Sequence, residues 1–144
     1  MGITLKCKKT GTNYDMGYFS FLILREKVAE LCSPEFGEHY KTLKDAPFQN
    51  IDNCRAEFFK AFDRKTQELL DSKAVHSKVA HFCLQSDCNG KIQYGACKEI
   101  YKHVKDYDDD YCYGYAASSN AMTFKDFKNL LLECIENKSQ LVWS

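Results

Sequence analysis

Apolar and polar residues alternate over short stretches near both ends of the chain. Residues 3–8 alternate in part, the turn-favouring Lys9-Thr10-Gly11 follows, and residues 12–16 return with a similar pattern. A period of two is typical of a half-buried strand, and the turn between the two runs is typical of a hairpin. We therefore predict a β-hairpin in residues 1–17. The apolar Leu141-Val142-Trp143 predicts a short strand in residues 138–144 that could join it.

Between residues 18 and 72 the apolar positions change to a helical spacing. Apolar residues at 21, 24, 28 and 31 predict a helix over 19–31. Ser33-Pro34-Glu35 supplies a capping hydroxyl, a proline and an acid in the order that starts a helix, so a short helix to about residue 43 should follow. Residues 45–52 predict a loop. Phenylalanines 58, 59 and 62 with Leu69 predict a helix over 53–70.

The motif with the most information lies in residues 85–96, Gln-Ser-Asp-Cys-Asn-Gly-Lys-Ile-Gln-Tyr-Gly-Ala. Before the motif, Ser72 is a candidate cap for a helix that would contain the apolar residues 75, 79, 82 and 83. After the motif, residues 97–104 can form a second helix. Asp87, Asn89, Gly90 and Ile92 occupy the third, fifth, sixth and eighth places of a twelve-residue loop. Oxygen-bearing side chains at alternate positions converge on a cation, and a glycine permits the sharp turn.

This pattern resembles an EF-hand, and a weaker second match follows it. If Met122 is the eighth place of a second loop, that loop spans 115–126, and Thr123 with Asp126 forms a capping pattern that starts a helix without any metal. The resemblance covers residues 74–135 and implies an EF-hand-like pair of helix-loop-helix units within residues 73–137. A plain helix–turn–helix hairpin around Asn89-Gly90 is the alternative.

The same loop departs from the calcium-binding pattern at its strongest ligand positions. Gln85 stands at the first place and Ala96 at the twelfth, where a bidentate Glu is needed. We therefore expect no metal or cofactor, and we regard Asp87 and Asn89 as vestigial. His76, His81, Cys83 and Cys88 lie within thirteen residues, but their spacing does not match a zinc module.

The acidic and aromatic stretch from residue 105 to residue 115 is the least core-like part of the chain. Four aspartates close together resist burial, and tyrosines beside them offer a rigid ring with a hydroxyl group. We predict a partner-binding surface here, formed by Tyr107, Asp108, Asp109, Asp110, Tyr111, Tyr113 and Tyr115. The alternative is a solvated connection whose tyrosine rings fold back onto the core. The helices on either side should pack through Ile100, Val104, Phe127 and Leu131.

Composition narrows the function classes. Twenty basic residues balance twenty acidic ones, which argues against binding to nucleic acid or to an acidic membrane. The start of the chain has no apolar signal segment, and no apolar stretch approaches the roughly 20 residues of a membrane span, so a cytoplasmic location is expected. In that compartment we expect all eight cysteines to stay reduced.

These observations predict a mainly α (α+β) protein of one domain, residues 1–144, whose role is binding rather than catalysis. Gln-Ser-Asp-Cys-Asn-Gly-Lys-Ile, Lys-Asp-Tyr-Asp-Asp-Asp and Phe-Lys-Asp-Phe-Lys resemble uncharacterised small proteins of Gram-positive bacteria, their phages and mobile elements. That resemblance implies an inhibitor or ligand-capture protein of the counter-defence kind. Its partner would be a protein with a basic surface or a small polar ligand. A calcium-linked regulator and a small Cys- or Asp-dependent enzyme are the alternatives, although no catalytic motif is present.

Overall fold

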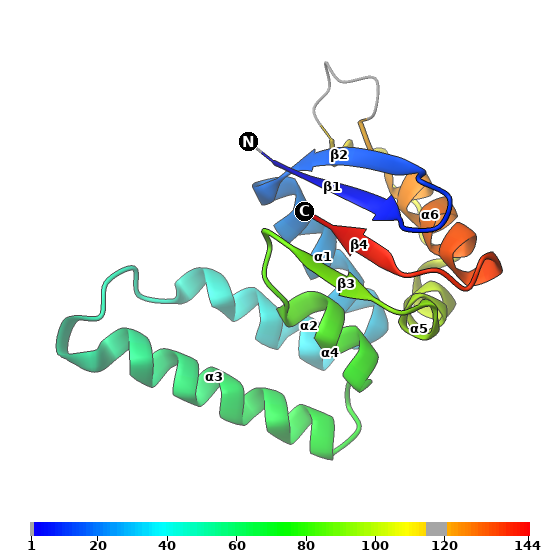
Figure 1. Cartoon of the computed structure of the whole chain (residues 1–144). Helices are drawn as coiled ribbons and strands as arrows, with labels where there is room; N and C mark the ends of the chain where they lie inside the picture. The colour runs from blue at the N-terminus through cyan, green and yellow to red at the C-terminus, as the bar shows by residue number, and fades with distance from the viewer. Residues whose placement is uncertain (1, 115–120) are drawn as a thin grey trace.

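A four-stranded antiparallel sheet joins the two ends of the chain in the computed structural model, which describes residues 2–114 and 121–144 (Figure 1). The predicted hairpin is confirmed as strands β1 and β2, and the predicted C-terminal strand is confirmed as β4. The strand order is β2-β1-β4-β3, so β4 lies between the hairpin and a strand from the middle of the chain. The bounds are β1 (Gly2–Cys7), β2 (Asn13–Gly17), β3 (Gly90–Ile92) and β4 (Leu141–Trp143).

Six α-helices make up most of the rest of the described chain, as predicted for a mainly helical protein. Their bounds are α1 (Tyr18–Cys32), α2 (Pro34–Lys41), α3 (Cys54–Asp71), α4 (Ser77–Leu84), α5 (Tyr94–Val104) and α6 (Phe124–Glu136). Two short 3-10 helices, residues 42–45 and 51–53, fall within or beside the predicted loop. None of the helices in the described ranges is long and apolar enough to cross a membrane.

Local capping signals predicted two helix starts correctly and one wrongly. The Ser33 hydroxyl accepts from the Phe36 N–H at the start of α2, and Thr123 with Asp126 forms a complete capping box at α6. The helix assigned to a Ser72 cap instead begins at Ser77. The Ser72 hydroxyl donates to the Leu69 carbonyl at the end of α3, and Lys73 has a left-handed φ of 60°, so the chain turns there before α4.

The core lies between the sheet and helices α1, α4, α5 and α6. Along β1, Ile3, Leu5 and Cys7 are buried on one face of the sheet, as a period of two requires. The predicted contact between α5 and α6 is confirmed, since both helices pack together and bury Ile100, Val104, Phe127 and Leu131. Trp143 of β4 packs 5.6 Å from both the Phe21 and the Phe82 rings, measured between ring centres.

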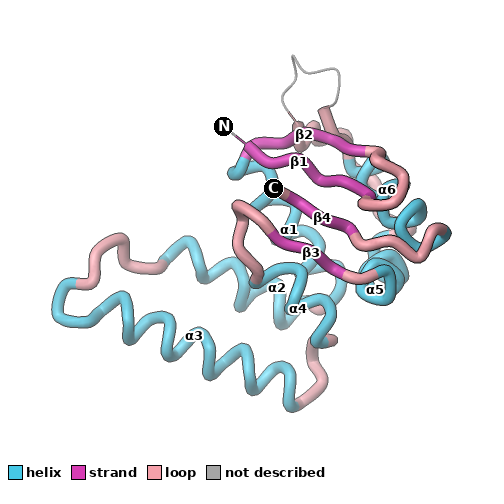
Figure 2. Tube along the Cα trace, viewed as in Figure 1, coloured by secondary structure: helices cyan, strands magenta, loops and turns pink. Residues whose placement is uncertain are grey.

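Residues 42–71 form a projection, here called the arm, that consists of the two 3-10 helices, the loop between them and α3 (Figures 1 and 2). Only Phe62, Thr66 and Leu69 are buried among the eighteen residues of α3. The His39 ring of α2 stacks on Phe62 with 4.0 Å between ring centres, and the His39 Nε2 lies 2.8 Å from the Thr66 hydroxyl oxygen. The arm is therefore attached to the rest of the molecule mainly through α2.

Candidate functional site

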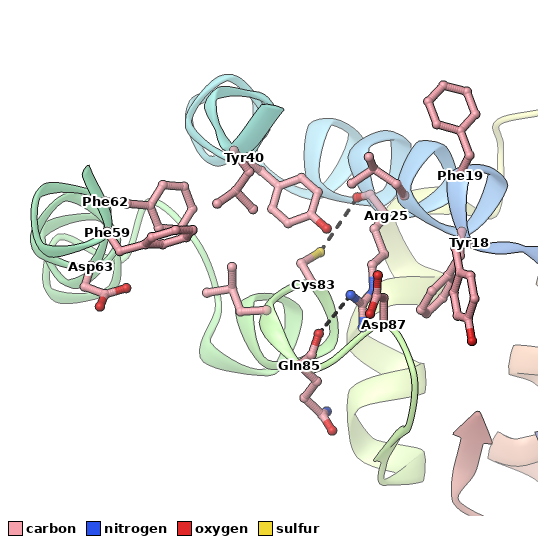
Figure 3. Close-up of a pocket in the computed structure, with 14 residues that line it drawn as sticks. Tyr18, Phe19, Arg25, Tyr40, Phe59, Phe62, Asp63, Cys83, Gln85 and Asp87 are labelled. Carbon is pink, nitrogen blue, oxygen red and sulfur yellow. Dashed lines mark hydrogen bonds between the residues drawn. The ribbon is translucent and has the colours of Figure 1, made fainter. Parts of the chain in front are cut away.

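A cavity of about 600 Å³ opens where the arm meets helices α1, α2 and α4 (Figure 3). We call it the Arg25 cavity. Its wall is mostly apolar, and the residues that form it come from four helices, from residue 43 at the base of the arm and from the loop that follows α4. They are Tyr18, Phe19, Phe21, Leu22, Arg25, Tyr40, Leu43, Phe59, Phe62, Asp63, Cys83, Leu84, Gln85 and Asp87.

The mouth and the floor of the Arg25 cavity differ in exposure. Phe19 at the edge is 72% exposed and Leu84 is 39% exposed, whereas Tyr40 and Cys83 are buried. Figure 3 shows Tyr40 of α2 and Cys83 of α4 reaching toward Arg25, with Phe59 and Phe62 of α3 on the far side. A concave, largely apolar site with a few polar groups is the usual form of a small-ligand pocket.

Arg25 is the unusual residue of this site because it carries a charge and is only 4% exposed. Its guanidinium carbon lies 4.2 Å from the Phe21 ring centre and 5.3 Å from the Trp143 ring centre, which is cation–π distance. Nη1 donates to the Gln85 carbonyl at 2.9 Å, and Nη2 donates to the Ser86 carbonyl at 3.3 Å. The side chain therefore links α1 to the loop after α4.

One hydrogen-bond donor of the Arg25 side chain has no acceptor. Its Nε is buried and has no hydrogen-bond partner among the described residues. Burial lowers the pKa of Arg25 from its ordinary value of 12.5, but a guanidinium stays protonated in proteins. A buried donor without an acceptor costs about 1–3 kcal/mol, and more for a charged group. The Arg25 cavity therefore holds a cation with unused hydrogen-bonding capacity.

The nucleophilic groups of the cavity are not activated. Burial raises the pKa of the Cys83 thiol well above its ordinary range, and burial likewise raises the pKa of Tyr40. The Cys83 Sγ donates to the Arg25 backbone carbonyl at 3.7 Å. Since a thiolate is the reactive form of cysteine, these surroundings favour an inert, structural thiol.

The loop over residues 85–92 lies between two helices as predicted, but several of its oxygens already accept hydrogen bonds. The Gln85 side chain donates to the Lys91 carbonyl at 2.8 Å and accepts from the Lys91 N–H at 3.1 Å. The Ser86 carbonyl accepts from Arg25 and also from the Trp143 indole N–H at 3.0 Å. A guanidinium and an amide thus satisfy carbonyls in this loop, and a metal ion would have to displace them.

The structure also gives a second reason for the glycine of the motif. A Cβ placed on Gly90 would lie 2.3 Å from the Trp143 ring, so the close approach of that ring requires glycine here. In a pair of EF-hands the two eighth-place residues, here Ile92 and Met122, would form a bridge, but Ile92 pairs instead with Leu141 of β4. Asp87 and Asn89 are exposed at the surface of the first loop.

In the acidic and aromatic segment, several side chains are tied to the body of the protein. Asp108 is ion-paired with Lys128 at 2.6 Å, and the ammonium group also donates to the Tyr107 carbonyl at 2.9 Å. The half-buried Tyr107 ring packs on Phe124 with 5.0 Å between ring centres. Asp110 and Tyr111 are exposed, and Tyr115 lies outside the described residues.

Tyr113 was predicted to belong to a partner-binding surface, but it is part of the core. It is 1% exposed, and its hydroxyl donates to the Asp109 carboxylate at 2.8 Å. Asp109 also accepts from the Tyr111 N–H at 3.1 Å. Burial and this hydrogen bond raise the pKa of Tyr113. The segment is therefore partly a structural connection between α5 and α6.

In residues 2–114 and 121–144, no three His, Cys, Asp or Glu side chains lie close enough together to hold a metal ion. All eight cysteines lie in these ranges, and each is a free thiol. Cys134 interacts with both Cys7 and Cys97 in the core, and its hydrogen bond with Cys97 together with burial raises the pKa of Cys134. Their reduced state in the cell stays a prediction.

Arg25 was absent from the candidate residues taken from the sequence, although one signal pointed to it. It falls four residues after Phe21 and three before Val28, on the apolar stripe of the first helix. A charged residue on a buried stripe is rarely free of a specific partner. Comparison of the chain with family models, curated proteins and solved structures yields no match, so the site rests on its own geometry.

Proposed function

We propose that this protein is a non-catalytic binding protein that captures a small ligand in the Arg25 cavity. One observation carries the proposal: a cavity of about 600 Å³ with aromatic walls has a buried cation with an unpartnered donor at its floor. Volumes of roughly 300–1,000 Å³ are typical of pockets that enclose small molecules. The expected inhibitor or ligand-capture role is consistent with a small chain that has such a pocket.

The alternatives find less support in the same contacts. A calcium-linked regulator needs six to eight oxygens around the ion, but the Lys91 carbonyl is bonded to Gln85 and the Ser86 carbonyl to Arg25 and Trp143. A cysteine-dependent enzyme needs an activated thiol, and burial raises the pKa of Cys83 in the cavity.

A protein partner with a basic surface is the second candidate. The observation that favours it is the exposure of Asp110 and Tyr111, which leaves part of the acidic and aromatic segment open to solvent. The variant Asp110→Ala with Tyr111→Ala tests it: the protein should fold normally and lose a salt-sensitive partner in a pull-down from host cells.

The test of ligand capture is to expose the purified chain to the small-molecule fraction of a host extract and to identify retained compounds by mass spectrometry. The variant Asp63→Trp places a large side chain at the cavity wall and should abolish retention. Glu57→Trp is the matched control, because it removes one carboxylate from another exposed position of α3 that does not line the cavity. Equal retention by both variants would contradict the proposal.

A further inference from the structure

The charge of Arg25 has no counter-ion at ion-pair distance in the described part of the chain. Its Nη atoms bond to two neutral carbonyls, and none of the ion pairs within 4.0 Å involves Arg25. A buried charge without an opposite charge is strongly unfavourable. The Asp87 carboxylate acts on Arg25 electrostatically from beyond ion-pair distance, so a negative charge in direct contact with the guanidinium is the first property expected of a ligand.

The geometry of the leftover donor suits an anion that presents two oxygens side by side, such as a carboxylate. Nε–H and one hydrogen of Nη2 lie on one edge of the planar guanidinium, and Nε has no partner among the described residues. A carboxylate places two oxygens in one plane at the spacing of that edge, so both hydrogen bonds can form together. A carboxylate bound in this way neutralises one positive charge with one negative charge.

The rest of the lining argues against a ligand with several charges. Asp63 and Asp87 are exposed at the rim, and Arg25 is the only Lys or Arg among the described residues that line the cavity. A phosphate dianion or a polyphosphate would add negative charge close to these two carboxylates. The ligand should therefore carry a single negative charge.

The aromatic residues of the cavity wall indicate the chemistry of the apolar part of the ligand. Rings of Tyr18, Tyr40, Phe59 and Phe62 line the space from three different helices, and Phe19 lies at its exposed edge. Flat aromatic ligands gain offset or edge-to-face contacts with such rings in addition to the burial of apolar surface. An aliphatic chain would gain burial alone.

We propose that the ligand captured in the Arg25 cavity is an aromatic monocarboxylate, with its carboxylate on the Nε edge of Arg25 and its ring between α1 and α3. The proposal rests on the proposed function and specifies the chemistry of the compound that is bound.

The first test compares acids with neutral molecules of the same shape, using calorimetry on the intact wild-type chain. The probes are 1-naphthaleneacetate and 3-phenylpropionate, each with its primary amide, and octanoate as an acid without a ring. Each aromatic acid should bind at least about tenfold more tightly than its amide, because charge-assisted hydrogen bonds are roughly twice as strong as neutral ones. Octanoate and adenosine triphosphate should bind more weakly than the aromatic acids.

The second test observes the proposed donor directly. The chain has only three arginines, at positions 25, 55 and 64, so ¹⁵N labelling of arginine gives three Nε signals. Arg55→Lys and Arg64→Lys assign them. The Arg25 Nε–H signal should shift when 1-naphthaleneacetate is added and should shift less with the amide, while the signal of exposed Arg64, which does not line the cavity, stays in place.

A pair of variants completes the test. Arg25→Gln should lose the preference for the acid over the amide, and Arg64→Gln, at an exposed position of α3 that does not line the cavity, should retain it. If Arg25→Gln fails to fold, the wild-type titration and the Nε signals still decide the question.

Three results would overturn the proposal. One is equal affinity for each acid and its amide. Another is octanoate or adenosine triphosphate binding more tightly than both aromatic acids. The last is the absence of binding by both aromatic acids at millimolar concentration. In each case the retention of host compounds by wild type but not by Asp63→Trp would leave the proposed function intact with a different ligand class.

Discussion

The arm and the rest of the protein, which we call the body, differ in how much of each helix is buried. Helix α6 buries five of its thirteen residues against the sheet and α5, whereas α3 buries three of eighteen. The body also closes its sheet with the last strand of the chain, and the arm packs mainly on α2. Local stability follows buried apolar contact, so the arm should open at a lower free energy than the body.

The position of the Arg25 cavity follows from this difference. Arg25, Tyr40, Cys83 and Leu84 belong to helices of the body, while Phe59, Phe62 and Asp63 belong to the arm. A rigid floor thus faces a wall that is less firmly held. Under the proposed function, a ligand bound at this boundary would hold the arm against the body.

The largest expected difference between the two regions comes from removing one aromatic ring from each. Phe127 is fully buried in α6, 6.2 Å from the Phe82 ring centre, and Phe127→Ala should cost about 3–5 kcal/mol of unfolding free energy. Phe58 is half-buried in α3, and Phe58→Ala should cost only about 1 kcal/mol. Urea denaturation measures both. Equal losses would mean that arm and body form one cooperative unit.

A smaller effect is expected from adding one methyl group to the loop that holds Arg25. Gly90→Ala would bring a Cβ to 2.3 Å from the Trp143 ring and should cost about 1–3 kcal/mol. Gly95→Ala is the matched control, because its Cβ would meet only the flexible end of Lys78, at 3.1 Å. The melting temperature of Gly90→Ala should therefore be clearly lower than that of Gly95→Ala. An unchanged melting temperature for Gly90→Ala would show that the indole ring moves without cost.

The acidic and aromatic segment should show one structural aspartate beside a dispensable one. Asp109→Ala leaves the buried Tyr113 hydroxyl without its acceptor and should cost about 1–3 kcal/mol. Asp106→Ala, at an exposed position, should stay within about 0.5 kcal/mol. Chemical denaturation compares the two. If both are neutral, the hydrogen bond between Tyr113 and Asp109 does not stabilise the connection between α5 and α6.

The attachment of the arm should weaken in mild acid. Burial lowers the pKa of His39 below its ordinary value of 6.5, so the unfolded chain binds the proton more readily. The stabilising contribution is complete above about pH 6.5 and is lost as the pH falls below that value toward the lower pKa of the folded state. Hydrogen exchange of α3 amides at pH 5.5 and 7.5, corrected for intrinsic rates, measures this change. His39→Gln should remove it, and an unchanged pH dependence in that variant would assign the effect elsewhere.

The smallest expected effect is that of calcium on the loop over residues 85–96. Because Gln85 and Ala96 replace two strong ligands and Gln85 occupies the Lys91 carbonyl, no binding is expected at millimolar calcium. Calorimetry that showed a dissociation constant below about 10⁻⁴ M would contradict this prediction. The loop would then carry a metal site in addition to the Arg25 cavity.

Features encoded by neighbouring residues were determined by the sequence itself. The hairpin, the helix spans and the caps at Ser33 and Thr123 follow from spacing and from side chains that reach the nearest backbone groups. The same local reasoning failed at Ser72, because a capping residue does not show which of two adjacent helices it serves.

Only the tertiary structure decided the features that join distant segments. The insertion of β4 between β1 and β3 put Trp143 against Gly90 and Arg25. As a result, the loop whose residue spacing resembles a calcium-binding loop is held in place by a guanidinium group instead of a metal ion. The burial of Tyr113 and the placement of α1 and α3 around one cavity arose in the same way. Sequence periodicity reports which face of an element is apolar, but the partner of that face depends on contacts between residues far apart in the chain, and no local pattern encodes those.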